Sequence, residues 1–238
     1  MTTNLVRADG SGAMFDQIAK RYDLLNRLMS FGMDRGWRRQ LIESMPSTGE
    51  LLDVATGTAD VGLALAKAHP NTTVVGLDPS TGMLAVGDKK IQAGALEDRV
   101  TLVVGDAQAM EFEDDRFSGC TIAFGIRNVP DRRLGLKEMV RVVKPGGVIS
   151  ILELSEPQGG FMAFMARMHV HHFVPLMGML LSGKREYRYL QTSIAAFPPA
   201  DAFKVMMEEA GLVDIEVRRL TFGVAHLYIA RVPSNPAQ

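Results

Sequence analysis

The stretch "ELLDVATGTADVGLALAKAH", residues 50–69, decides the fold of this chain. Residues 50–56 form an apolar run typical of a buried strand, and apolar side chains recur at helical spacing after Asp60. A turn of small residues around Gly57 separates the two patterns. The stretch therefore predicts a strand that passes through a tight turn directly into a helix.

The same alternation continues along the chain. Further strands are predicted at 72–78, 99–106, 118–124 and 148–154, and helices at 80–94, with Ser80 as N-cap, and at 131–143, ended by "KPGG". A last helix at 200–211 precedes two β runs, 212–223 and 224–232, that are close enough to form an antiparallel hairpin. Single helices between nearly continuous apolar strands indicate an α/β, Rossmann-like doubly wound sheet, mostly parallel with an antiparallel last strand.

Length and composition limit the classes of protein. The 238 residues fit a single domain, and the net charge of -1 offers no basic face for nucleic acid. Cys120 is the only cysteine, which excludes an internal disulfide and suits a reducing cytoplasm. The N-terminus has no apolar core of a secretory signal. We therefore expect a cytoplasmic protein that binds no nucleic acid.

Two segments stand outside the strand and helix alternation. Residues 14–46 have helical periodicity and are too short for a domain, so we expect them to cap the carboxyl edge of the sheet. Residues 155–199 form an apolar insertion rich in methionine and aromatic side chains. Its most hydrophobic part, 161–181, is interrupted by Arg167, Pro175 and three histidines, which argues against a membrane-spanning helix.

The turn after the first strand predicts a nucleoside-binding site. Ligands of such sheets bind beyond the carboxyl ends of the strands, where Gly57 allows close approach to the backbone. Asp78 ends the second strand about 20 residues later, where an acid typically accepts from ribose hydroxyls. Ala55 and Asp60 replace glycines of the dinucleotide fingerprint, and an acid opening the helix would repel a pyrophosphate. We therefore expect a ribose-containing cofactor without phosphates at this turn.

S-adenosylmethionine fits that description. Its sulfonium and amino group would lie near Asp53, Asp106 would accept from the adenine amino group, and Ala107 would leave space for the ring. Capping of a turn is the plainer explanation for Asp53 or Asp106 alone. Because each acid ends a different strand, the set as a whole favours a nucleoside-sulfonium pocket.

Several motifs together resemble a known family. "LLDVATGTAD", "GLDPSTGML", "GDAQAMEFEDDRF", "FGIRNVPD" and "EMVRVVKPGG", with "RYDLLNRLMSFGMDRGWRR" and "EYRYLQTSIAAFP", are similar to the S-adenosylmethionine-dependent C-methyltransferases of menaquinone and ubiquinone biosynthesis, from about Met14 to Arg231. The resemblance implies the class I methyltransferase fold. It also implies cofactor contacts at Thr58, Asp78, Asp106 and Ala107, with Gly57 and Asp53 in the same loop. The departures are Thr56, where cysteine or glycine is frequent, Ala59, where glycine is frequent, and Asp106, where asparagine is frequent.

The implied reaction methylates a ring carbon of a prenylated demethylmenaquinol to give menaquinol. Arg127, at the end of the fourth strand, would stabilise the hydroquinone oxyanion, since an arginine is a poor general base. Asn128 would orient the hydroxyl or a water, and Tyr22 of the cap would close over the ring. The plainer alternatives are a polar loop that starts a helix at Asp131 and, for Tyr22, a packing tyrosine.

The apolar insertion is the segment in which we expect contacts with the substrate or the membrane. We expect residues 155–199 to hold the prenyl tail or to contact the inner face of the membrane peripherally, with a core helix or a homodimer contact as the alternatives. "HVHH" (169–172) lacks a helical ligand pair and a nearby acid or cysteine, so no metal site is expected. The rival functions are methylation of a ubiquinone-precursor benzoquinol, an NAD-dependent oxidoreductase and a non-catalytic quinone carrier.

Overall fold

The structure is a computed structural model, and it describes residues 19, 30, 32–156 and 184–234. In chain order its elements are α2 (Asp34–Glu43), β1 (Thr48–Val54), α3 (Asp60–Ala68), β2 (Asn71–Asp78), α4 (Thr81–Ala93), β3 (Val100–Val104), β4 (Phe117–Ala123), the short 3-10 helix η1 (Ile126–Asn128), α5 (Arg132–Val142), β5 (Val143–Leu154), α8 (Lys184–Ala195), α9 (Ala200–Glu209), β6 (Val213–Leu220), the 3-10 helix η3 (Thr221–Gly223) and β7 (Ala225–Arg231).

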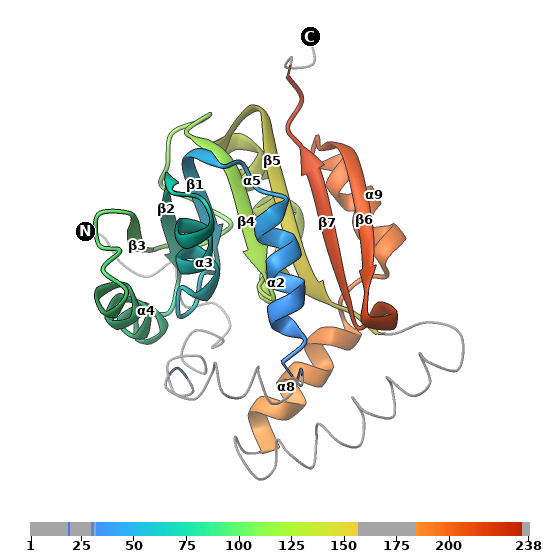
Figure 1. The fold of residues 1–238 in the computed structure, drawn as a ribbon. Coiled ribbons are helices and arrows are strands. Elements are labelled where there is room, and N and C mark those ends of the chain that lie inside the picture. The colour runs from blue at the N-terminus through green and yellow to red at the C-terminus, as the bar shows by residue number, and fades with distance from the viewer. Residues whose placement is uncertain (1–18, 20–29, 31, 157–183, 235–238) are drawn as a thin grey trace, which may run out of the picture.

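The strands form one seven-stranded sheet in the order β3-β2-β1-β4-β5-β7-β6. Strands β1 to β5 run parallel to one another, and β7 is antiparallel to both β5 and β6. The predicted doubly wound sheet with an antiparallel end is thus confirmed. The strand order reverses between β1 and β4, and the parallel strands end at the lower edge of Figure 1, beside α8.

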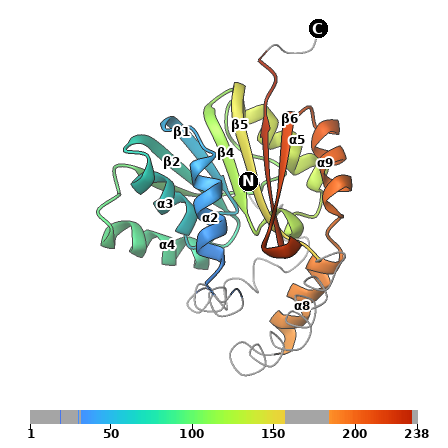
Figure 2. The ribbon, with the colours of Figure 1, turned by 45° about the vertical axis from the view of Figure 1, so that its right-hand side comes forward.

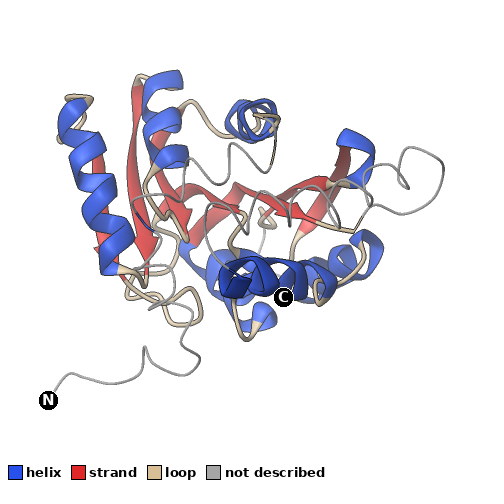
Figure 3. Ribbon diagram, turned by 90° about the horizontal axis from the view of Figure 1, so that it is seen from below, coloured by secondary structure: helices blue, strands red, loops and turns tan. Residues whose placement is uncertain are grey.

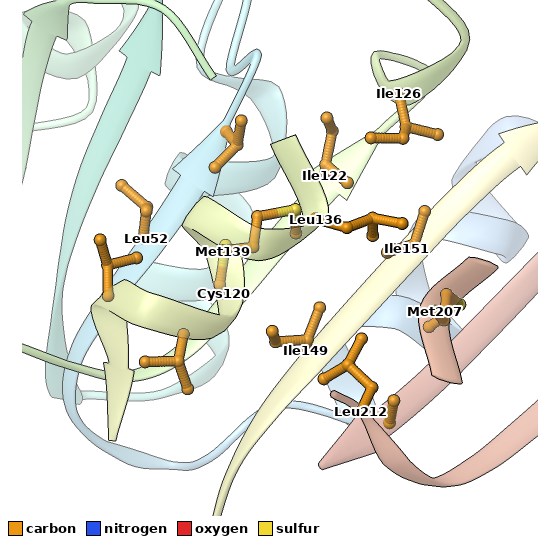
Figure 4. Packing of buried hydrophobic residues seen from close by; sticks show 14 of the residues in the cluster. Leu52, Cys120, Ile122, Ile126, Leu136, Met139, Ile149, Ile151, Met207 and Leu212 are labelled. Atoms are coloured by element: carbon orange, nitrogen blue, oxygen red, sulfur yellow. The ribbon is translucent and has the colours of Figure 1, made fainter. Parts of the chain in front are cut away.

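Helices cover both faces of the sheet, as Figure 3 shows from below. On one face, α2 and α3 bury Trp37, Leu41 and Leu65 against the sheet. On the other face, α5 and α9 pack over β4, β5 and β7, and Figure 4 shows Leu136 and Met139 of α5 beside Cys120 of β4. Both faces of the central strands are therefore buried, which explains their continuous apolar sequences.

The helix starts follow the expected capping chemistry. The Ser80 hydroxyl accepts from the Met83 N–H at 3.1 Å, which confirms the predicted N-cap of α4. At the start of α5, the Asp131 carboxylate accepts from the Leu134 N–H at 3.0 Å. Both bonds satisfy backbone donors that a helix cannot pair internally.

The segment "KPGG" differs from its prediction as a simple helix end. Strand β5 begins at Val143, immediately after α5, because Val143 pairs with Phe117 before the proline. The parallel register then shifts, and pairing resumes between Val148 and Gly119. The shift is accommodated at Gly146, whose φ of +77° lies in the left-handed region that favours glycine.

Candidate functional site

The loop from β1 to α3 forms the floor of a hollow at the switch point of the sheet. Its backbone is left-handed at Ala55, Gly57 and Ala59, with φ of 50°, 56° and 64°. These small side chains let the loop curve away from the strand end. The hollow has an empty volume of about 320 Å³, open solvent included, and it is lined by Arg38, Asp53, Ala55, Thr56, Gly57, Thr58, Asp60, Val61 and Ala123.

Asp53 is the buried acid of this hollow. Its carboxylate accepts from the Thr56 hydroxyl at 2.6 Å, the Thr121 hydroxyl at 2.9 Å and the Gly62 N–H at 3.1 Å. The bonds to Thr56 and Gly62 tie Asp53 to the following turn, as the turn-capping alternative predicts. Burial nevertheless dominates and raises the pKa of Asp53 to about 6, although the hydrogen bonds and the charge of Arg38 lower it. An arriving cation would compensate this desolvated carboxylate.

Arg38 brings a positive charge to the same hollow from α2. Its guanidinium lies 5.4 Å from the centre of the Phe124 ring, and Nη1 lies 3.7 Å from the Asp60 carboxylate. The Arg38 Nε atom is buried, lies 3.7 Å from the Asp34 carboxylate and makes no hydrogen bond to any described residue. Arg38 thus lies near two carboxylates, neither within hydrogen-bond distance, and its guanidinium can still donate to an anionic ligand group.

The other predicted cofactor residues lie along the same edge. The Asp78 carboxylate accepts from the Gly57 N–H and from the Ser80 N–H, both at 2.8 Å, so it joins the end of β2 to the β1–α3 loop. The Thr58 hydroxyl accepts from the Lys90 ammonium at 2.8 Å. Three of the predicted residues, Asp53, Gly57 and Thr58, line the hollow itself.

Asp106 and Ala107 follow β3, two strands from β1. Asp106 is partly buried, and its Oδ1 accepts from the Gln108 N–H at 2.9 Å, as in the turn-capping interpretation. The Gln108 amide also donates to the Asp106 carboxylate at 3.1 Å. The structure therefore places both residues beyond the lining of the hollow, on the side of β2 and β3.

Arg127 is held in a buried ion pair. It lies in η1 directly after β4, with 8% of its surface exposed, and its Nη1 donates to the Glu153 carboxylate at 2.8 Å. Nη1 also donates to the Phe124 carbonyl, and the Arg127 backbone N–H donates to the other Glu153 oxygen at 3.1 Å. Glu153 itself is fully buried. Arg127 is therefore a fixed residue of the sheet edge and not a solvated loop side chain.

Helix α8 contacts Arg127 and Asn128 of η1 from outside the sheet. The Arg127 Nε donates to the Ser193 hydroxyl at 3.3 Å, and the Tyr189 hydroxyl donates to the Asn128 Oδ1 at 3.2 Å. Among the described residues, no hydrogen bond involves the Arg127 Nη2. Tyr22, the third residue predicted at the substrate end, lies outside the described residues, as do 157–183 with their histidines and methionines.

Sequence reasoning missed Arg38, Glu153, Tyr189 and Ser193. Glu153 carried a readable signal, because it is the only charged residue in the predicted strand "VISILEL", and a buried carboxylate requires a partner. Arg38, Tyr189 and Ser193 lie in polar helical stretches where nothing distinguishes them from surface residues.

Comparison with known proteins adds to this geometry. The sequence model of the ubiE/COQ5 methyltransferase family matches residues 5–231. The chain is 44% identical over 218 residues to the ubiquinone/menaquinone biosynthesis C-methyltransferase UbiE of Geobacter sulfurreducens, covering 90% of this chain and 85% of the relative. It is 42% identical to the demethylmenaquinone methyltransferase of Thermus thermophilus, covering 92% of this chain and all of the relative.

Solved structures share the fold at lower sequence identity. A putative S-adenosyl-L-methionine-dependent methyltransferase of Methanococcus maripaludis superposes with a TM-score of 0.68 at 16% identity, and each chain is fully covered. The phosphoethanolamine N-methyltransferase 2 of Haemonchus contortus, in complex with S-adenosyl-L-methionine, has a TM-score of 0.61 at 17% identity, over 79% of this chain and 50% of the other. At these identities the comparison establishes the common fold.

Proposed function

The chain belongs to the ubiE/COQ5 methyltransferase family, and from this premise we propose that it transfers the methyl group of S-adenosylmethionine to a ring carbon of a prenylated demethylmenaquinol. The observation that carries the proposal is the placement of two charged centres at neighbouring strand ends. Asp53 is the penultimate residue of β1 with Arg38 beside it, and Arg127 follows β4 with Glu153 beside it. A cofactor and an acceptor ring can therefore meet at the switch point.

The charges of the hollow fit the amino-acid end of S-adenosylmethionine. Asp53 would attract its ammonium and sulfonium groups, and Arg38, whose Nε lies 3.7 Å from Asp34 and makes no hydrogen bond to a described residue, would bind its carboxylate. The bound cofactor supplies a methyl group on a positively charged sulfur. The remaining proposed contacts are the loop at Gly57 and Thr58, Asp78 for the ribose, Asp106 for the adenine amino group and Ala107 beside the ring.

At the substrate end, Arg127 would act by electrostatics. Glu153 and the Phe124 carbonyl hold one side of its guanidinium, and Nη2 would donate to the ring oxyanion that makes the neighbouring carbon nucleophilic. Asn128 would orient the hydroxyl, and Tyr22 would close over the ring. Holding both reactants in line can contribute up to roughly 7 to 11 kcal/mol to the barrier reduction.

The choice of demethylmenaquinol follows the relatives' names. The Thermus thermophilus and Bacteroides fragilis relatives are named demethylmenaquinone methyltransferases, at 42% and 39% identity. The Geobacter sulfurreducens relative carries both quinone names, so a ubiquinone-precursor benzoquinol is the second candidate.

The proposal is tested by assaying both reduced quinols side by side with a labelled methyl donor. We expect label in menaquinol, at a higher kcat/KM than for the benzoquinol. Faster methylation of the benzoquinol would overturn the choice of substrate. Methylation of neither quinol under reducing conditions would overturn the enzymatic proposal.

We further propose that residues 155–199 hold the prenyl tail or contact the membrane surface. The flanks of this segment support the idea, because β5 ends at Leu154 and Tyr189 contacts Asn128, so the segment leaves and returns beside the site. No helix of 32–156 or 184–234 has the length and apolar character to cross a membrane. Sedimentation with vesicles would test the contact, and analytical ultracentrifugation would test the alternative homodimer.

A further inference from the structure

Helix α8 presents two hydroxyl groups to consecutive residues of η1. Tyr189 and Ser193 are four positions apart, so they share one face of the helix. The Tyr189 hydroxyl donates to Asn128, and the Ser193 hydroxyl accepts from Arg127. In Figures 1 and 2, α8 lies beyond the lower end of the sheet, apart from the helices that cover its faces.

The guanidinium of Arg127 is held from two sides. The Glu153 carboxylate of β5 accepts from Nη1 and from the backbone N–H of Arg127, and the Ser193 hydroxyl of α8 accepts from Nε. Two contacts from different elements determine the plane of a guanidinium, which is rigid. The direction of Nη2 consequently depends on the position of α8 as well as on the sheet.

The amide of Asn128 is oriented in the same way. Its Oδ1 accepts from Tyr189 at 3.2 Å, which directs the two donors of its amide nitrogen away from that hydroxyl. Without the Tyr189 hydroxyl, the half-buried amide could rotate among several hydrogen-bonding arrangements.

We propose that Tyr189 and Ser193 are positioning residues, which fix Asn128 and Arg127 in the orientation that methyl transfer requires. The inference rests on the proposed function, in which Arg127 and Asn128 face the substrate ring. It assigns to α8 a part in catalysis that the two hydroxyls exert through Asn128 and Arg127.

The first test compares Tyr189→Phe and Ser193→Ala with a matched control, Tyr228→Phe. The Tyr228 hydroxyl is buried and has no hydrogen-bond partner among the described residues, so its removal is the same chemical change without a lost contact. We expect kcat to fall about three- to tenfold in each test variant, as for loss of one hydrogen bond, and to stay unchanged in the control. The affinity for S-adenosylhomocysteine should stay within error in all three variants, and Ser193→Thr should keep its rate.

The second test is a pair of double-mutant cycles. If Tyr189 acts through Asn128, Tyr189→Phe should cost nothing further in an Asn128→Ala background. Likewise, Ser193→Ala should cost nothing further in an Arg127→Lys background, which lacks Nε. Additive losses, or single variants that match Tyr228→Phe, would overturn the inference alone. Normal rates in Asn128→Ala and Arg127→Lys would overturn the inference together with the proposed roles of these residues.

Discussion

The pairing of Arg127 with Glu153 limits what this arginine can do. Both side chains are buried, and removing one member of a buried pair leaves an uncompensated charge in the sheet. The pair also leaves little free positive charge, so in the proposed function Arg127 would act through a directed donor and not as a general attractor of anions. A substitution here should accordingly change the rate through geometry.

We predict that Arg127→Lys retains cofactor binding and loses about 100-fold in kcat, since a lysine can pair with Glu153 but cannot also present a second fixed donor. Steady-state rates and calorimetric titration with S-adenosylhomocysteine measure the two quantities. Arg133→Lys, the same change at an exposed arginine of α5, is the matched control. A near-normal rate in Arg127→Lys would favour the alternative in which Arg127 belongs to a polar loop before the helix that starts at Asp131.

The raised pKa of Asp53 predicts a pH dependence of cofactor binding. Its folded pKa of about 6 means that the carboxyl is neutral below this pH and attracts a cation only above it. Affinity for S-adenosylhomocysteine should therefore rise from pH 5 to pH 7, by up to about tenfold per unit below the pKa. The amino and carboxyl groups of the ligand titrate outside this window, at about 8 and about 3.5.

Calorimetric titrations across this range measure the effect. Asp53→Asn should remove the pH dependence, whereas Asp60→Asn, at another carboxylate of the same hollow, should retain it. An unchanged pH profile in Asp53→Asn would show that a different group controls binding.

At the scale of elements, α2 contributes more than a cover for the sheet. Trp37 is buried against the sheet, and its Nε1–H donates to the Thr221 hydroxyl of η3 at 2.9 Å. The next residue, Arg38, thereby reaches the hollow beside β1. The described part of the predicted cap thus lies on a face of the sheet while one of its side chains enters the site.

We predict that Arg38→Met weakens S-adenosylhomocysteine binding about 10- to 100-fold, the range for a charge-assisted hydrogen bond. Arg39→Met, at the exposed neighbour on the same helix, is the control and should bind normally. The same titration should show the pH window of Asp53 displaced upward in Arg38→Met, because the lost cation no longer lowers that pKa. Equal affinities in the two variants would contradict the carboxylate contact.

At the scale of the molecule, the topology brings the ends of β1, β4 and β5 to one edge and attaches segment 155–199 there. An apolar tail held by this segment would add binding energy in proportion to its buried length. The benefit of a long tail should then depend on the methionines of the segment.

We predict that Met165→Glu with Met168→Glu lowers kcat/KM for long-tailed quinols more than for short-tailed ones. Steady-state assays with two tail lengths measure the ratio. Val205→Glu, at an exposed apolar position of α9, is the control and should leave the ratio unchanged. Equal losses for both tail lengths would exclude tail binding by these methionines.

The sequence by itself determined the alternation of strands and helices, the Ser80 cap, the small-residue loop at Gly57 and the family. These features are local, because periodicity, capping and turn chemistry act between residues near in the chain. It also indicated that Asp53 and Arg127 end strands of one sheet, since parallel strands share a carboxyl edge.

Only the tertiary structure decided which groups surround those residues. Arg38 meets Asp53, Glu153 pairs with Arg127, and Tyr189 meets Asn128 across long stretches of chain. Such partners are selected by burial, because a desolvated charge or amide is stable only where the packed elements bring a complementary group within hydrogen-bond distance. That selection depends on how α2, β5 and α8 pack, and local sequence patterns do not encode it.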